Sequence, residues 1–135
     1  MLEKNKETVR RYFIELWEKQ NFDIIDEVFT TEFKGHLVNP SKGKEGIQKN
    51  VQIMKRAFPN GRLVIDDLFG EADKICIRWR YLGKHEGDFM NIPPTGKDVV
   101  LKGITIERFE NGKIAELWAE MDIFDLLKQL EVIKM

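Results

Sequence analysis

The hydrophobic pattern of this chain changes period at Gly61, and that change limits the folds available to it. Before Gly61 apolar residues recur about every 3.6 residues, whereas after it they alternate with polar residues. The first period is typical of amphipathic helices and the second of strands. Helices followed by a run of strands favour an α+β domain in which the helices cover one face of a single sheet.

Three helices are expected before Gly61, over residues 9–17, 23–29 and 45–58. Asp23 is the expected N-cap of the second helix, and Pro59 ends the third. Between these two helices lies the stretch "TTEFKGHLVNPSKGK". We interpret it as a break in the regular structure.

Four strands are expected after Gly61, in the segments "RLVIDDLF", "KICIRWRYL", "VVLKGITIERF" and "KIAELWAEMD". Asn111-Gly112 separates the last two and is a strong hairpin signal, while "GEAD" is a candidate hairpin between the first two. A helix over residues 123–130 completes the pattern. We therefore expect a single domain over residues 1–135.

The composition excludes several classes of protein. A chain of 135 residues with 42% hydrophobic residues suits one globular domain. Its 22 Lys+Arg and 23 Asp+Glu give a net charge of -1, so nucleic acid and anionic membranes are not expected partners. The start of the chain lacks an apolar signal segment, and we expect a cytoplasmic protein. A lone cysteine, Cys76, excludes an internal disulfide and is interpreted as a small buried residue.

The last expected strand has no plainly solvated face. In "KIAELWAEMD" one set of alternate residues is apolar, and the other mixes Ile114 and Trp118 with carboxylates. Such a sheet suggests an interior pocket on one side and a partner subunit on the other. We therefore expect a homodimer joined through its sheets.

Several segments, taken in order, resemble one known family. They are "VRRYFIELWEKQNFDIIDEVF", "FKGHLVNP", "GIQKNVQIMKRAFPN", "IRWRYLGKHEGDFMNIPPTGK", "ITIERFENGKIAELWAEMD" and "LLKQL". Together they are similar to the SnoaL-like polyketide cyclases, also called ester cyclases, of the nuclear transport factor two-like superfamily. The resemblance runs from about Lys6 to Leu130.

The resemblance implies a cone-shaped, curved antiparallel or mixed sheet wrapped around N-terminal helices, with one deep apolar pocket. The cyclases it points to close a ring by intramolecular aldol condensation and use no metal or organic cofactor. A pocket aspartate moves protons in that reaction, and on this chain it corresponds to Asp122 in "WAEMD". Other members of the superfamily are isomerases, dehydratases, hydrolases or binding proteins, so the fold alone does not fix the function.

Asp122 has two interpretations. It shares strand parity with Trp118 and Glu120, so the three side chains are expected on one wall of a pocket, where apolar surroundings would raise the pKa of a carboxyl. Glu120 would then be a second carboxylate beside it. Alternatively, Asp122 is the N-cap of the last helix, because Asp125 follows three residues later, and capping would lower its pKa.

The two histidines, His36 and His85, are candidate partners of Asp122. Either could polarise a carbonyl or relay a proton, and His36 is the preferred one. A structural role is an equally good interpretation of each. An iron site of two histidines and Asp122 is a further alternative, although their separations fit no local ligand spacing.

An apolar or aromatic small molecule is the expected partner of the pocket. Most of the aromatic side chains are interpreted as core residues, and the rest as contacts of a flat ligand. "NIPPTGK" is interpreted as a rigid crossover that holds Phe89, Met90 and Ile92 near the pocket mouth, without acid/base chemistry of its own. The residues expected to contact substrate are Tyr12, Phe13, Trp17, Phe33, Met54, Phe58, Trp79, Phe89, Trp118 and Glu120.

Two functions from different classes remain open on the sequence. One is a cofactor-independent enzyme that uses acid/base chemistry on a carbonyl compound, with Asp122, His36 and His85 as catalytic residues. A resistance protein acting on foreign compounds would have the same sequence features. The other is a non-catalytic binding or dimerisation module of the same fold.

Overall fold

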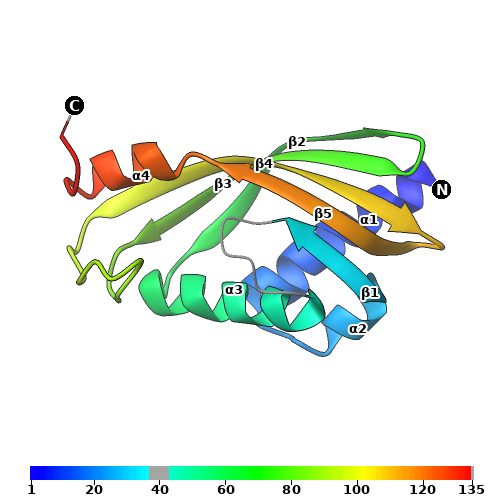
Figure 1. Ribbon diagram of the computed structural model, residues 1–135, viewed down its shortest axis with the longest axis horizontal. Helices are drawn as coiled ribbons and strands as arrows, with labels where there is room; N and C mark the ends of the chain where they lie inside the picture. The colour runs from blue at the N-terminus through cyan, green and yellow to red at the C-terminus, as the bar shows by residue number, and fades with distance from the viewer. Residues whose placement is uncertain (37–42, 135) are drawn as a thin grey trace.

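Five strands form one strongly curved mixed sheet in the computed structural model, which describes residues 1–36 and 43–134 (Figure 1). The strands follow the order β1-β5-β4-β3-β2 across the sheet. All neighbouring pairs are antiparallel except β1 and β5, which are parallel. Their bounds are β1 (Phe29–His36), β2 (Arg62–Glu71), β3 (Lys74–Lys84), β4 (Asp98–Glu110) and β5 (Lys113–Met121).

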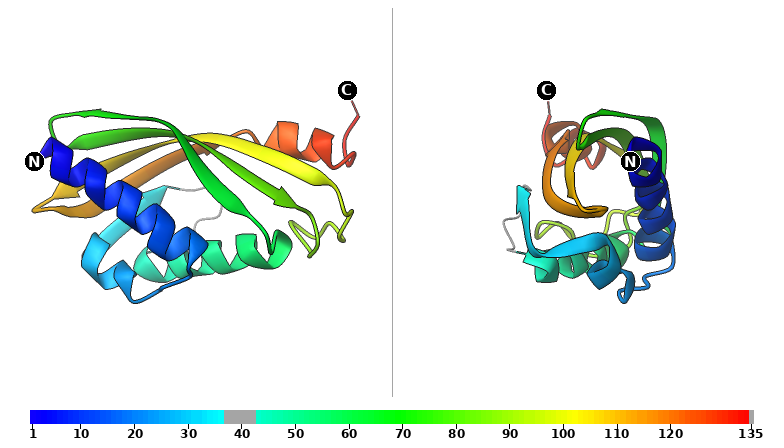
Figure 2. Two further views of the ribbon diagram at one scale, coloured as in Figure 1. Left: turned by 180° about the vertical axis from the view of Figure 1, so that it is seen from behind. Right: turned by 90° about the vertical axis from the view of Figure 1, so that its right-hand side faces the viewer.

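The helices lie on the concave side of this sheet, except for the C-terminal one. Figure 2 shows the sheet curving around α1 and α3, with α4 beyond the end of β5. The α+β architecture predicted from the change in period is confirmed. The helical bounds are α1 (Leu2–Tyr12), η1 (Phe13–Glu18), α2 (Ile24–Val28), α3 (Gly43–Ala57) and α4 (Ile123–Gln129).

The first helix differs from its prediction in length and in pitch. It begins at Leu2, and from Phe13 it widens into the π-helical segment η1, in which the Lys19 amide donates to the Ile14 carbonyl at 3.0 Å. Wide turns of this kind are rare and occur often at functional sites. Here the widened turns carry Phe13, Leu16 and Trp17 toward the concave face of the sheet.

Two local predictions are wrong. The stretch interpreted as a break contains all of β1 except Phe29, the last residue of the predicted second helix. The ladder from β1 to β5 shifts register between Phe29 and Lys34, so the side chains of β1 do not alternate regularly. Only the pairing with β5 makes this segment a strand. Residues 37–42 of the same stretch lie outside the described residues. Asp23 precedes α2, but its side chain makes no capping hydrogen bond.

Both predicted hairpins are present. Asn111 and Gly112 have φ of 51° and 80°, the left-handed values that a tight two-residue turn needs. Ala72, in the "GEAD" turn, has φ of 55°. These turns set β2 against β3 and β4 against β5, so that every second side chain of each strand faces the helices.

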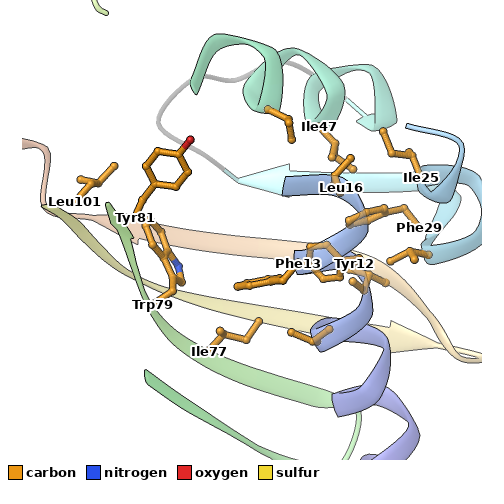
Figure 3. Packing of buried hydrophobic residues seen from close by; sticks show 14 of the residues in the cluster. Tyr12, Phe13, Leu16, Ile25, Phe29, Ile47, Ile77, Trp79, Tyr81 and Leu101 are labelled. Carbon is orange, nitrogen blue, oxygen red and sulfur yellow. The ribbon is translucent and has the colours of Figure 1, made fainter. Parts of the chain in front are cut away.

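The core side chains pack between the concave face of the sheet and the helices (Figure 3). Val9 and Leu16 from the first helix, Phe58 after α3 and Ile75 and Ile77 of β3 are almost completely buried. Within residues 1–36 and 43–134, no helix combines the length and the apolar character required to span a bilayer.

Candidate functional site

A cavity of about 610 Å³ lies between the concave face of the sheet and the helices. Most of its lining side chains are apolar and come from η1, β1, α3 and strands β3 to β5. Figure 3 shows Phe13, Leu16, Trp79, Tyr81 and Leu101 among the side chains around this space. A volume of this size is within the range that accommodates small organic molecules.

Few polar groups line the cavity, and one of them lacks a partner. The Trp79 indole Nε1 donates to the Thr105 hydroxyl at 2.9 Å, so the indole is satisfied within the wall. The Tyr81 hydroxyl is buried and has no hydrogen-bond partner among the described residues. Burial raises the pKa of Tyr81 to about 12. This phenol therefore stays neutral at neutral pH.

A buried carboxyl lies behind the cavity wall and is hydrogen-bonded to a residue that lines it. Glu107 of β4 is 0% exposed, and its Oε2 accepts a hydrogen bond of 2.6 Å from the hydroxyl of Tyr12, which lines the cavity. The other carboxyl oxygen has no partner among the described residues. Burial raises the pKa of Glu107 to about 8, against a smaller lowering by the Tyr12 hydrogen bond. At neutral pH this carboxyl is mainly protonated.

Residues 88–91 border the opening of the cavity. Asp88, Met90 and Asn91 are exposed and also line the cavity, while Phe89 is buried. Met90 and Asn91 have φ of 50° and 64°, and Phe89 bridges to Ile92. The segment thus doubles back tightly at the entrance.

His85 fastens the "NIPPTGK" loop behind this opening. It is 0% exposed, and its Nδ1 accepts the Thr95 backbone N–H at 3.1 Å and lies 3.0 Å from the Thr95 hydroxyl. The Thr95 hydroxyl also accepts from the Lys97 amide at 3.3 Å. Because Nδ1 accepts a hydrogen bond, the ring proton of neutral His85 is on Nε2. His85 is absent from the described lining of the cavity.

Asp122 lies on the other side of the sheet. It is exposed and caps α4, where its Oδ1 accepts the Asp125 amide at 3.0 Å. Asp122 and Glu120 line a shallow hollow on the outer face together with Arg78 and Arg80. The N-cap interpretation therefore matches the local geometry, and the expectation that these two carboxylates face an apolar interior is wrong.

His36 and Trp118 also lie on the outer face. The His36 ring stacks on the Trp118 indole, with centroids 5.4 Å apart and planes 15° apart. Its Nε2 lies 2.7 Å from Oε2 of Glu116, which holds the pKa of that carboxyl below its ordinary value. The three residues proposed as an iron site are thus not brought together, and the described part of the chain contains no cluster of three possible metal ligands.

Strand parity separates the predicted contact residues into two groups. In β5 the residues that line the cavity are Leu117, Ala119 and Met121, so Trp118 and Glu120 point outward. Phe58 is 1% exposed and packs in the core without lining the cavity. The predicted residues that do line it are Tyr12, Phe13, Trp17, Phe33, Met54, Trp79 and Phe89.

Glu107 was not among the residues expected from the sequence, although a signal was present. In β4 the buried residues alternate with exposed or half-buried ones, and Glu107 has the parity of Leu101, Thr105 and Phe109. A glutamate on the apolar side of a strand is rare, because burial of a carboxylate without a partner is costly. That position marks it as a candidate for acid/base chemistry.

The comparisons with known proteins agree with this architecture. The family model described as SnoaL-like polyketide cyclase matches residues 7–130. The chain belongs to this family. The resemblance seen in the sequence, to SnoaL-like polyketide cyclases of the nuclear transport factor two-like fold, is confirmed.

Solved structures share the fold at low sequence identity. TsrD from Streptomyces laurentii is 24% identical, with a TM-score of 0.86, and the match covers 96% of this chain and 96% of that protein. A SnoaL-like polyketide cyclase from Agrobacterium tumefaciens strain C58 is 21% identical, with a TM-score of 0.79, and the match covers 93% of this chain and 97% of that protein. Comparison with curated proteins found no match.

Proposed function

We propose that this SnoaL-like protein is a cofactor-independent enzyme that encloses an apolar carbonyl compound and transfers a proton at the carbon next to the carbonyl. Aldol cyclisation, isomerisation and elimination all begin with that transfer. The observation that carries the proposal is the apolar cavity of about 610 Å³ with a buried carboxyl hydrogen-bonded to Tyr12 in its wall. A carboxyl with a pKa of about 8 is present in both protonation states near neutral pH, and it contacts the cavity through the Tyr12 hydroxyl.

The experiment is hydrogen–deuterium exchange of a bound ketone. 2-Acetylnaphthalene is incubated with the protein in D₂O, and loss of its methyl proton signal is followed by NMR. We expect exchange faster than in buffer, because general acid/base catalysis contributes about 10²-fold or more. Ala119→Phe fills the cavity and should abolish the acceleration. Ile104→Phe, on the exposed face of β4, is the matched control and should leave it unchanged.

Asp122 is included in the same experiment, since its catalytic role stays a prediction. Asn also caps a helix well, so Asp122→Asn should preserve folding. If exchange is lost in a stable Asp122→Asn protein, the proton carrier is Asp122. If exchange is unchanged, the role of Asp122 is to cap α4.

The second candidate function, a binding module without catalysis, rests on the buried, unpartnered Tyr81 hydroxyl in the cavity wall. One hydrogen-bond donor in an apolar cavity is sufficient for selective binding. Tight binding of the ketone with exchange no faster than in buffer would favour this module over the enzyme.

We also propose that the protein is a homodimer joined through the outer faces of its sheets. Support comes from a row of side chains across all five strands, formed by Phe69, Cys76, Ile106, Trp118 and His36. Phe69 is 58% exposed and Ile106 39% exposed, so the row offers apolar surface to a partner. Charged side chains flank the row, as they do at the rim of many interfaces.

A further inference from the structure

A buried polar pair adjoins the cavity, and no ligand contact has yet been assigned to it. The hydroxyl of Tyr12, from α1, donates to Glu107 Oε2, from β4, at 2.6 Å, and the two residues are 95 positions apart in the chain. Tyr12 is 4% exposed and Glu107 is 0% exposed. Burial of such a pair is costly, which suggests a purpose other than stability.

The pair adjoins the space available to a ligand. Tyr12 itself lines the cavity. Thr105, the previous residue of β4 on the same face, and Leu117, the register partner of Glu107 in β5, line it as well. Glu107 is not part of the lining, so the carboxyl reaches a ligand through the phenol of Tyr12.

Among the described residues, Tyr12 is the one titratable side chain that affects the pKa of Glu107. Its neighbours across the ladders are Ile75 of β3 and Leu117 of β5, which carry no charge. The causes of its raised pKa are burial and the opposing Tyr12 hydrogen bond. Burial and the nearby carboxylate also raise the pKa of Tyr12, so in this pair the carboxyl ionises first.

The protonation state of Glu107 decides where the Tyr12 hydrogen points. When Glu107 is ionised, it accepts the phenolic hydrogen and leaves no donor for a ligand. When Glu107 is neutral, its own O–H can donate to the Tyr12 oxygen. The phenolic hydrogen is then free to bond an acceptor in the cavity, and the two hydrogen bonds in series strengthen each other.

We propose that Tyr12 is the hydrogen-bond donor that anchors the carbonyl or enolate oxygen of the ligand, and that neutral Glu107 is the positioning residue that frees the Tyr12 hydrogen for this bond. The proposal rests on the proposed function, because it assumes an apolar ligand in the cavity. It adds to that function the ligand group that is recognised, a carbonyl or enolate oxygen, and the residue that recognises it, Tyr12. A donor fixed in this way also stabilises negative charge as an enolate forms.

The test compares two ligands of the same shape. 2-Acetylnaphthalene has a carbonyl acceptor, whereas 2-ethylnaphthalene has none, and quenching of Trp17 and Trp79 in the cavity wall reports binding of both. Below pH 8 we expect the ketone to bind about tenfold more tightly, the worth of one well-made buried hydrogen bond. Above pH 8 the preference should fall toward one, because ionised Glu107 takes the phenolic hydrogen.

Three variants assign the effect to its residues. Tyr12→Phe should remove the preference at every pH. Glu107→Gln should keep the preference, because the amide N–H replaces the carboxyl O–H, and should remove its pH dependence. Tyr81→Phe removes the other buried hydroxyl of the cavity wall and decides which of the two phenols bonds the ketone, while Ile104→Phe on the exposed face of β4 is the control that should change neither. If Tyr12→Phe does not fold, as judged by circular dichroism, the Glu107→Gln profile decides.

Each contrary outcome has a distinct meaning. If neither compound binds, the proposed function fails and the anchor with it. If both bind equally well, the anchor is overturned while an apolar cavity function stands. Loss of the preference in Tyr81→Phe would assign the contact to Tyr81, and loss of the preference at every pH in Glu107→Gln would assign it to the carboxyl itself. Either result would overturn the proposal. A pH dependence that persists in Glu107→Gln would overturn the positioning role.

Discussion

Glu107 is the residue at which stability and chemistry conflict most directly. A carboxyl in an apolar interior favours its neutral form, and burial raises the pKa of Glu107 from 4.5 to about 8. The unfolded chain would ionise near the ordinary value instead. Between these two values the folded protein holds a proton that the unfolded chain releases.

The free energy of unfolding should therefore decline as pH rises from about 4.5 to about 8 and level off above it. Each unit of difference in pKa is worth about 1.4 kcal/mol, so the decline should amount to a few kcal/mol. Urea unfolding of the wild type and of Glu107→Gln over this range measures it. The variant carries no titrating group here, and the difference between the two curves isolates Glu107. Parallel curves would contradict the assignment.

The sequence of the loop after β3 predicts what this loop does but not which contact holds it in place. Its prolines and glycine predict a rigid crossover near the cavity opening, and Phe89 and Met90 do line the cavity. The loop is held by His85, whose Nδ1 accepts the Thr95 backbone N–H and contacts the Thr95 hydroxyl. His85 thus has a structural contact with this loop.

Thr95→Val should loosen this loop. It removes the hydroxyl that lies 3.0 Å from His85 Nδ1 and accepts from the Lys97 amide, and we expect a loss of about 1 kcal/mol in the free energy of unfolding. Hydrogen exchange at residues 88–91 should become faster. Thr95→Ser keeps the hydroxyl and is the control. Equal exchange in both variants would show that the backbone contacts alone hold the loop.

At the scale of the whole molecule, the two faces of one sheet have different tasks. The concave face packs on helices and encloses the cavity, while the convex face carries the row from Phe69 to His36. Apolar side chains of this row are exposed in the single chain, and a dimer joined through this face would cover them.

Ile106→Glu tests the homodimer proposal. A charge in the middle of the row should convert a dimer into a monomer, because a buried unpaired carboxylate is costly at an interface. Light scattering at micromolar concentration measures the mass. Ile14→Glu, at a residue of η1 that is 46% exposed and not in the sheet, is the control and should leave the mass unchanged. A monomeric wild-type protein would refute the dimer.

The sequence by itself determined the features that depend on local chemistry. The change of period at Gly61 predicted helices before strands, and Asn111-Gly112 predicted the last hairpin, because propensity and turn geometry act over a few residues. The capping role of Asp122 was also available, since its partner Asp125 is three residues away. Family membership followed from the same ordered segments.

Only the tertiary structure decided the features that depend on distant pairings. β1 becomes a strand because β5, about 80 residues later, supplies its hydrogen-bond partners. Curvature of the sheet around α1 and α3 determines which parity of β5 faces the cavity, and it turns Glu120 and Asp122 outward. The same curvature brings Tyr12 against Glu107 across 95 residues. Alternation shows that a strand has two faces, but only packing decides which one is enclosed.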